Sequence, residues 1–297
     1  PFAGGGAIPL EALRVGADAF ASDLNPVAVL LNKVTLEYIP RYGQSLADEV
    51  RKWGRWVKEE AENELSEFYP KDSDGSTPIA YLWARTIVCE GPGCGAEVPL
   101  MPSSLIAKRK NNSVGLLLQA DKSEKNIEVI LEQPITRNFD KTGTVAKGSV
   151  TCPRCKYTTP IKSVRRQLIS VQGGADKARL LAIQTIDSAS RRRYRTVQAT
   201  DLDAISKAKL ELLRRKGELS EYVTVPDEPL PLMSGVFNVP LYGHDNWGTM
   251  FTSRQALLLT TLARIVRDLA KQKSKHEVPI EVLTSILALA VDRQADY

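Results

Sequence analysis

Four cysteines are the first residues in this sequence whose types and spacing indicate chemistry. They form two close pairs, Cys89 with Cys94 and Cys152 with Cys155, and no other cysteine occurs among the 297 residues. Each pair lies on a turn rich in glycine or proline, which is how a zinc knuckle directs two thiolates at one ion. Four thiolates make a closed tetrahedral zinc site, which is structural because no coordination position stays open. Two disulfide bonds are the alternative, and a cytosolic location disfavours them.

A glycine loop near the start of the sequence is the second chemical signal. Gly4, Gly5 and Gly6 lack side chains, so the backbone can turn tightly and a ligand can touch its N–H groups. A short helix follows, and a strand over residues 17–21 leads to Asp23. In a parallel α/β sheet this spacing places the carboxylate beside the loop, where it accepts hydrogen bonds from both ribose hydroxyls of an adenosine cofactor. The alternative is a glycine-rich turn that binds no ligand.

The loop departs from the dinucleotide-binding fingerprint. Pro9 stands at the third glycine position, which disfavours NAD. The stretches PFAGGG and SDLNPVAV instead resemble the cofactor motif and the following acidic motif of S-adenosylmethionine-dependent amino-methyltransferases of DNA. The resemblance implies that Phe2, Gly4 and Gly6 contact the methyl donor and that Asp23 holds its ribose.

Further stretches, in order along the chain, resemble the adenine-specific DNA methylases that contain a zinc ribbon. They are LWARTIVCEGPGCGAEVPL, CPRCKYTTPIKSVRRQ, PDEPLPL, VPLYGHDNWGTMFTSRQALLL and ALALAVDRQADY. The resemblance implies an α/β fold, a Rossmann-like methyltransferase sheet present in part, with a zinc ribbon and β-rich region inserted and helices at the C-terminal end. The implied activity is methyl transfer from S-adenosylmethionine to the N6 amine of an adenine swung out of double-stranded DNA. Restriction-modification or phage defence would fit such an enzyme.

The catalytic motif of this family is absent from the sequence. That motif, (Asp/Asn/Ser)-Pro-Pro-(Tyr/Phe/Trp), aligns the amine with the methyl group, whereas the 297 residues contain no Pro-Pro dipeptide. In the family order it follows the ADY stretch, and Pro1 stands directly after the expected first strand of the sheet. We therefore expect a fragment of the enzyme that is inactive as given. The alternative is a non-catalytic zinc-ribbon protein that binds nucleic acid and has a degenerate cofactor fold.

Basic residues provide candidate DNA contacts. The net charge of +5 and the pI of about 9.0 permit a polyanionic partner. Guanidinium groups bind phosphates and a tyrosine ring can stack on a base, so the candidates are Arg165, Arg166, Arg192, Arg193 and Tyr194. A solvated surface is an equally good interpretation for any one of these arginines. His244 and His276 are solitary, and we interpret both as surface or loop residues.

The resemblance, together with periodicity and composition, implies three regions. Residues 1–78 are expected to form the N-terminal part of the methyltransferase domain, residues 79–199 the zinc-ribbon and β-rich insertion, and residues 200–297 a helical region that returns to the first domain. The expected helices cover residues 8–16, 27–37, 45–68, 200–216 and 253–273, with another opened by Pro279. The expected strands cover residues 79–88, 114–119, 127–131, 180–186 and 194–199.

The sequence has no apolar run of the roughly twenty residues that a membrane span requires, and no leader that is basic and then apolar. We therefore expect a cytoplasmic protein without a membrane partner. The oligomeric state cannot be predicted from these features.

Overall fold

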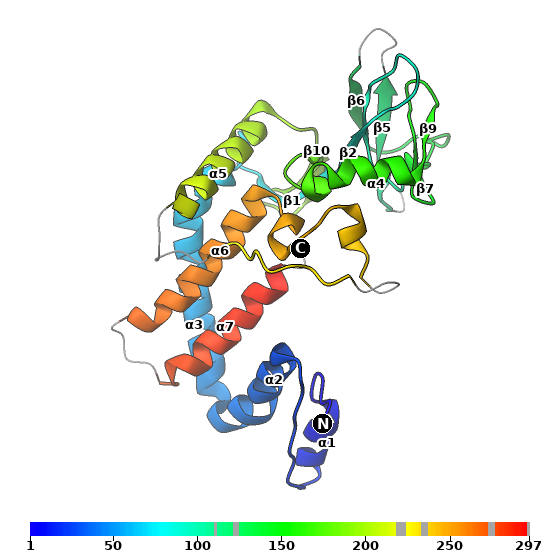
Figure 1. Cartoon of the computed structure of the whole chain (residues 1–297). Helices are drawn as coiled ribbons and strands as arrows, with labels where there is room; N and C mark the ends of the chain where they lie inside the picture. Colours follow the sequence, from blue (N-terminus) through cyan, green and yellow to red (C-terminus); the bar gives the residue numbers. More distant parts are fainter. Residues whose placement is uncertain (110–111, 121–124, 218–223, 233–236, 273–276, 296–297) are drawn as a thin grey trace. The chain divides into compact units, whose positions relative to one another are not determined.

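A computed structural model describes residues 1–297 except 110–111, 121–124, 218–223, 233–236, 273–276 and 296–297 (Figure 1). The fold is mixed α/β, with helices and small antiparallel sheets. The chain divides into two compact units. We call Pro1–Ser66, Arg215–Thr224 and Leu257–Tyr297 the helical unit, and Glu67–Arg214 and Val225–Ala256 the sheet unit. Each unit is described by itself.

The sheet unit contains a three-stranded sheet whose central strand is β10 (Arg179–Ile186), between β1 (Thr77–Ala84) and β11 (Arg192–Arg195). Both pairings are antiparallel. Leu180, Leu181, Ala182 and Ile183 of β10 are all buried. Because successive side chains point to opposite faces of a sheet, this part of β10 is covered on both faces.

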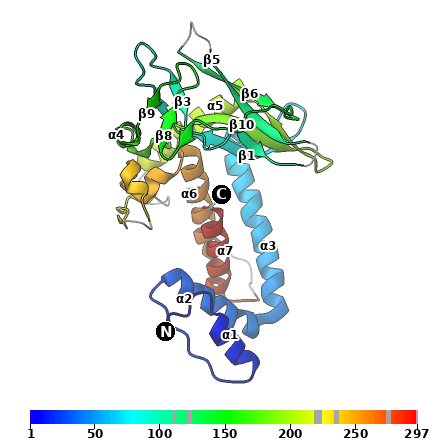
Figure 2. The same cartoon turned by 90° about the vertical axis from the view of Figure 1, so that its right-hand side faces the viewer.

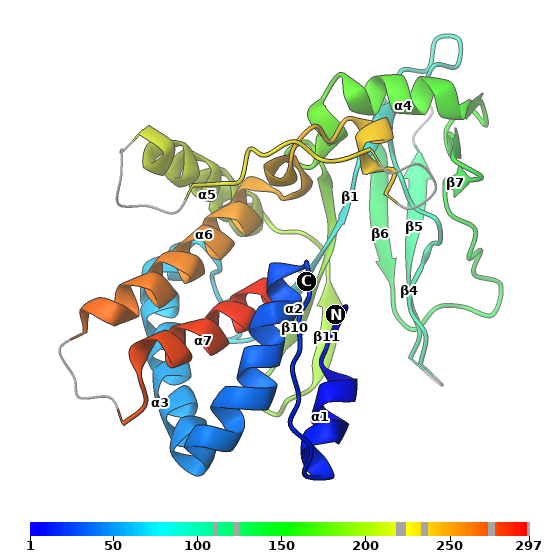
Figure 3. The ribbon, with the colours of Figure 1, turned by 60° about the horizontal axis from the view of Figure 1, so that its bottom comes forward.

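Three smaller antiparallel sheets complete the sheet unit. The strands are β2 (Thr86–Val88) with β3 (Glu97–Pro99), then β4 (Leu105–Ala107), β5 (Val114–Ala120) and β6 (Ile127–Glu132), and then β7 (Val145–Ala146), β8 (Ser149–Thr151) and β9 (Thr158–Thr159). Figure 3 shows β4, β5 and β6 side by side. Helix α4 (Ile161–Ile169) buries Val164 and Leu168 in the same core as three of the cysteines.

The helical unit is built of helices (Figure 2). They are the short α1 (Ala7–Arg14) and α2 (Pro26–Asn32), which continues as a π-helix over Lys33–Tyr38, and the longer α3 (Ile39–Leu65), α6 (Ser253–Asp268), whose first turn belongs to the sheet unit, and α7 (Ile280–Gln294). Helix α3 buries Leu46, Trp53, Val57, Ala61 and Leu65, which recur every four or seven residues, and this stripe packs against α7.

Helix α5 (Ala199–Gly217) passes from the sheet unit into the helical unit, and short 3-10 helices connect the larger elements. These short helices are Ser66–Phe68, Gln172–Gly174, Val239–Tyr242, Trp247–Met250 and Leu269–Lys271. Among the described residues, no helix combines the length and the apolar character needed to cross a membrane.

The mixed α/β class expected from the sequence is confirmed, and most expected helices and strands are found within a few residues of their predicted bounds. The expected parallel strand over residues 17–21 is not formed: in the described part of the chain every strand pair is antiparallel, and these residues pair with no strand. A parallel strand is stable only between hydrogen-bonded neighbours. The strand expected over residues 194–199 also differs, because β11 ends at Arg195 and Ala199 is the first residue of α5.

Candidate metal centre and candidate cofactor loop

The two cysteine pairs occupy the turns of two short hairpins in the sheet unit. Cys89 and Cys94 lie between β2 and β3, where the Cys89 N–H donates to the carbonyl of Ala96 over 2.8 Å. Cys152 and Cys155 lie between β8 and β9, where the Cys152 N–H donates to the carbonyl of Tyr157 over 2.9 Å. Two hairpins that are far apart in the sequence therefore present their thiols to one point.

The sulfur geometry fits one tetrahedral ion. The Sγ atoms of Cys89 and Cys155 are 3.5 Å apart, those of Cys94 and Cys152 are 3.8 Å apart, and all four lie within 4.8 Å of one another. Four thiolates about 2.3 Å from a zinc ion would be roughly 3.8 Å apart. A disulfide bond requires about 2.05 Å, and the four cysteines are free thiols. The geometry is compatible with structural zinc and does not fit the disulfide alternative.

Burial affects how readily three of the four thiols ionise. Burial raises the pKa of Cys89 and of Cys152. Burial acts on Cys94 in the same direction, but hydrogen bonds from the Ala96 backbone and from Cys155 and Arg154 lower the pKa of Cys94 to about 6. Buried thiols resist ionisation without a partner, and a bound divalent ion supplies the positive charge that deprotonates them.

Gly91 shows how closely the two hairpins approach. A Cβ atom at this position would lie 2.9 Å from the Sγ of Cys155 and 2.9 Å from the Cβ of Tyr157. Its N–H also donates to the Sγ of Cys89 over 3.4 Å. Glycine is required at this position because the opposite hairpin leaves no room for a side chain, a signal that spacing alone did not reveal.

The candidate cofactor loop in the helical unit brings the glycines to Asp23. The Gly4 N–H donates to one carboxylate oxygen of Asp23 over 2.8 Å, and the Asn25 N–H donates to the other over 2.9 Å. The Ala3 N–H donates to the carbonyl of Ser22 over 3.0 Å. The bonds from Asn25 and then Gly4 hold the pKa of Asp23 below its usual range. The loop and the carboxylate are therefore neighbours, as their spacing predicted.

Asn32 is a structural residue of this loop that the sequence reasoning missed. Its side-chain amide donates to the carbonyl of Gly4 over 2.8 Å and to that of Ala28 over 2.7 Å, so it joins the loop to α2. A Cβ atom on Gly6 would lie 2.6 Å from the Oδ1 of Asn32. Gly6 is therefore required by packing, whereas a Cβ atom on Gly4 or Gly5 would meet nothing within 4 Å.

The remaining cofactor candidate, Phe2, is 87% exposed and has a positive φ of 60°. Ile8, Phe20 and Leu24 are also largely exposed, at 85%, 90% and 95%. The first 24 residues thus present several large apolar side chains to solvent, which is unusual for a folded surface.

The candidate DNA contacts divide between two elements of the sheet unit. Arg166 is exposed on α4, whereas Arg165 is half-buried with its guanidinium 5.2 Å from the ring centre of Tyr242. Arg192 and Arg193 are exposed on β11, and Tyr194 is half-buried there. Within the described residues, neither Arg192 nor Arg193 makes an ion pair. Both remain available to an anion.

Arg195, at the end of the same strand, has a structural role. Its guanidinium makes paired hydrogen bonds of 2.7 to 2.8 Å with the carboxylates of Asp72 and Asp201. The carboxylate of Asp201, followed by that of Asp72, raises the pKa of Arg195. This arrangement, the Arg195 clamp, joins β11 to the loop before β1 and to the first turn of α5. Asp201 also accepts a hydrogen bond from the Gln198 N–H, just before α5.

The expectation that His244 is a surface or loop residue is wrong in one respect, because the ring is 1% exposed. It lies in a loop but packs on Gly173, where a Cβ atom would come within 2.2 Å of the ring. His276 lies outside the described residues.

Comparison with protein-family models, with curated proteins and with solved structures found no match to this chain.

Proposed function

We propose that this chain is the cofactor-binding and zinc-binding part of an S-adenosylmethionine-dependent DNA methyltransferase that acts on the N6 amine of adenine. The observation that carries the proposal is the pairing of Asp23 with the glycine loop, through the 2.8 Å bond from the Gly4 N–H. Asp23 follows Gly4 by 19 positions in the sequence. The amino-methyltransferase motifs that these stretches resemble would require this pairing.

The residues of the loop are suited to the methyl donor. Each oxygen of the Asp23 carboxylate accepts one backbone hydrogen bond, so each keeps capacity for a ribose hydroxyl. The backbone at Gly4 and Gly5 is open to a ligand, because nothing lies within 4 Å of the position that a Cβ atom would take at either glycine. When bound, S-adenosylmethionine would supply a methyl group activated by its positive sulfur. Asp23 would orient the adenosine and the loop would contact the methionine part.

The exposed apolar side chains support the same proposal. Phe2, Ile8, Phe20 and Leu24 surround the candidate loop in sequence, and each is at least 85% exposed. In a methyltransferase domain, the central sheet and the cofactor would cover such side chains. We propose that this surface is the contact face of the glycine loop with the rest of that domain.

The proposed zinc ion has a structural role. Four cysteine ligands leave no position for a substrate, so the ion would join the β2–β3 and β8–β9 hairpins. Double-stranded DNA is the proposed partner, with the exposed side chains of Arg166, Arg192 and Arg193 as phosphate contacts.

Calorimetric titration of the full-length protein with S-adenosylmethionine tests the proposal. We expect binding in the wild type and at least about tenfold weaker binding in Asp23→Ala, because a charged acceptor for two hydroxyls is removed. Zinc content should remain one ion per chain in both proteins. Unchanged affinity for S-adenosylmethionine in the variant would show that Asp23 is not part of the site. Tighter binding of NAD than of S-adenosylmethionine would show that the cofactor is a nicotinamide and not the methyl donor.

The second candidate is a non-catalytic protein that binds nucleic acid through the sheet unit. Arg192 and Arg193 favour it, because both are exposed on β11 and no ion pair occupies either within the described residues. Transfer of a tritiated methyl group to duplex DNA separates the two candidates. DNA binding without cofactor binding by the full-length protein would favour the second.

The 297 residues contain no Pro-Pro dipeptide. We therefore expect this stretch alone to transfer no methyl group, and only a longer gene product that contains the motif to be active. Absence of the motif from the complete gene would contradict the enzyme proposal.

A further inference from the structure

A pocket of about 660 Å³ lies in the sheet unit, at a place that the proposed function does not use. Its wall comes from the end of β1, from α4, from the β7–β8 hairpin and from the segment that includes Tyr242 and Met250. Most of the lining side chains are apolar, including Leu100, Val164 and Val239. The volume suits one small organic molecule.

Of the described residues that line this pocket, Arg85 alone is charged. It follows β1 directly and is half-buried. Within the described residues no carboxylate forms an ion pair with its guanidinium, and no hydrogen bond engages it. Burial without a partner lowers the pKa of Arg85, although the group stays charged at neutral pH. A half-buried cation in apolar surroundings is therefore left without a counter-charge.

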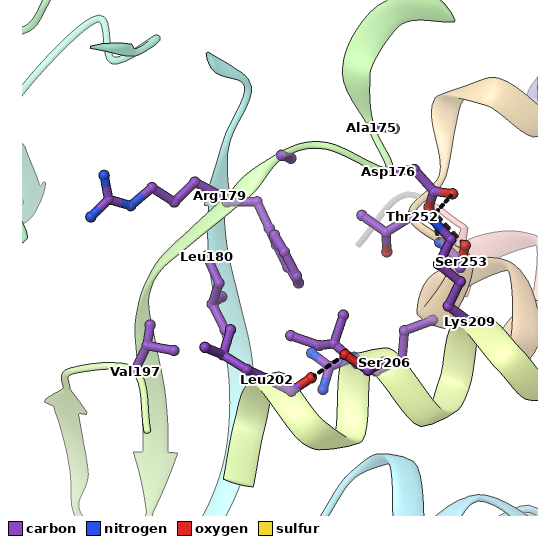
Figure 4. A pocket seen from close by; sticks show the side chains of 14 residues that line it. Ala175, Asp176, Arg179, Leu180, Val197, Leu202, Ser206, Lys209, Thr252 and Ser253 are labelled. Atoms are coloured by element: carbon purple, nitrogen blue, oxygen red, sulfur yellow. Dashed lines mark hydrogen bonds and ion pairs between the residues drawn. The ribbon is translucent and has the colours of Figure 1, made fainter. Parts of the chain in front are cut away.

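A neighbouring pocket of about 430 Å³, shown in Figure 4, provides the contrast. Trp83 lines both pockets. In the smaller one Asp176 accepts hydrogen bonds from the N–H and hydroxyl of Ser253, and it lies 3.7 Å from the ammonium of Lys209. Figure 4 shows the side chain of Arg179 directed away from the other labelled side chains. The smaller pocket thus contains a carboxylate of its own, whereas the described residues that line the larger one include none.

The buried ring of His244 adds no second charge near Arg85. Burial lowers the pKa of His244, and the positive charge of Arg85 lowers it further. The imidazole is therefore neutral at physiological pH. Its Nδ1 is 3.2 Å from the hydroxyl of Thr249. Uncharged polar side chains, those of Tyr242, Thr252 and Gln255, complete the lining.

We propose that this cavity, the Arg85 pocket, binds a small organic anion with an apolar body and one carboxylate. The apolar wall would receive the body, and the guanidinium of Arg85 would make two parallel hydrogen bonds with the carboxylate. An anion would bind more tightly than a neutral ligand because it supplies the negative charge opposite Arg85. A neutral ligand would leave the half-buried guanidinium without a counter-charge.

Calorimetric titration of the full-length protein with 1-naphthoate and with its neutral isostere, 1-naphthamide, tests the proposal. The two probes share one apolar body and differ in charge. In the wild type we expect the affinity for naphthoate to be at least about tenfold higher than that for naphthamide, because only the carboxylate forms charge-assisted hydrogen bonds with Arg85. Arg85→Gln should abolish this preference. Arg85→Lys should keep part of it, because lysine retains the charge without the paired geometry.

Arg137→Gln is the matched control, because it removes one positive charge from an exposed residue that does not line the pocket. It should leave both affinities unchanged, and thermal unfolding with zinc content reports whether each variant is folded. Equal affinity for the two probes in the wild type would overturn the proposal, as would an anion preference that survives in folded Arg85→Gln. Displacement of naphthoate by a duplex oligonucleotide would also overturn it and assign Arg85 to nucleic acid.

Discussion

At the scale of single residues, Asp23 is held in its charged form by backbone N–H groups of neighbouring residues. The Asn25 and Gly4 N–H groups donate to the two carboxylate oxygens, and they keep the pKa of Asp23 below its usual range. The form that would accept ribose hydroxyls is present above that pKa and disappears as the pH falls through it. The proposed cofactor affinity should therefore stay level from neutral pH down through the ordinary titration range of aspartate.

Calorimetry at stepped pH values tests this expectation. Asp23→Asn is the control, because the amide has a similar shape and no titration. Its affinity should be about tenfold weaker throughout. A loss of wild-type binding between pH 7 and pH 5 would show that another group controls the site.

Gly91 provides a second test at the same scale. In Gly91→Ala the new methyl group would lie 2.9 Å from the Sγ of Cys155, so the hairpins would have to separate. We expect zinc affinity to fall about tenfold, as is typical when the support of a metal ligand is disturbed. Gly217→Ala is the control, because its Cβ would meet nothing within 4 Å. Competition with a chromophoric chelator measures both, and equal affinities would show that the hairpins adjust freely.

At the scale of elements, the Arg195 clamp joins three parts of the sheet unit through one guanidinium. The side chains of Arg195, Asp72 and Asp201 are 16%, 12% and 4% exposed, so removing the cation would leave two poorly solvated carboxylates together. We expect Arg195→Gln to lower the free energy of unfolding by about 3 to 5 kcal/mol. Arg192→Gln, on an exposed position of the same strand, should change it by less than about 0.5 kcal/mol. Chemical denaturation distinguishes the two.

The same clamp should depend on pH in one direction. Burial acts to raise the pKa of Asp201, but hydrogen bonds from Arg195 and from the Gln198 N–H outweigh it and lower the pKa. Its contribution to stability is therefore complete above the ordinary aspartate pKa and is lost as the pH falls through the lowered one. Asp201→Asn should lack this part of the acid dependence. An identical acid profile in both proteins would place the dependence elsewhere.

Some elements could be predicted from the sequence and others could not. Helix α3 was predictable because Leu46, Trp53 and Val57 recur at helical spacing and are all buried. The pairing of the strands was not predictable, because a local sequence pattern does not reveal which distant segment will form hydrogen bonds with a strand. Residues 17–21 read as a strand from their composition, yet no described strand pairs with them.

The candidate sites show the same limit. The cysteine cluster was predictable because each of two turns carries a close pair of thiols and one zinc ion takes four, and the approach of Gly4 to Asp23 was predictable from their spacing. Asn32 and His244 gave no signal in the sequence. Their roles come from contacts with Gly4 and Gly173, which are distant along the chain.

At the scale of the whole molecule, removal of the proposed zinc ion should affect the two units differently. The hairpins that carry the cysteines have strands of only two or three residues, and such short strands are unstable without a further constraint. Structural zinc sites contribute about 10 to 16 kcal/mol of binding free energy to folding. The long helices of the helical unit depend instead on apolar packing between α3 and α7.

Hydrogen exchange measured after treatment with a chelator and a reductant tests this difference. Amides in residues 86–99 and 149–159 should lose protection, whereas those in residues 46–65 of α3 should keep it. Cys155→Ser should reproduce the loss without a chelator, because a site with three thiolates is weaker, and added zinc should restore protection in the wild type alone. Protection that persists at both hairpins in protein free of metal would show that their own packing, around Ile87, Val98 and Val150, is sufficient to hold them.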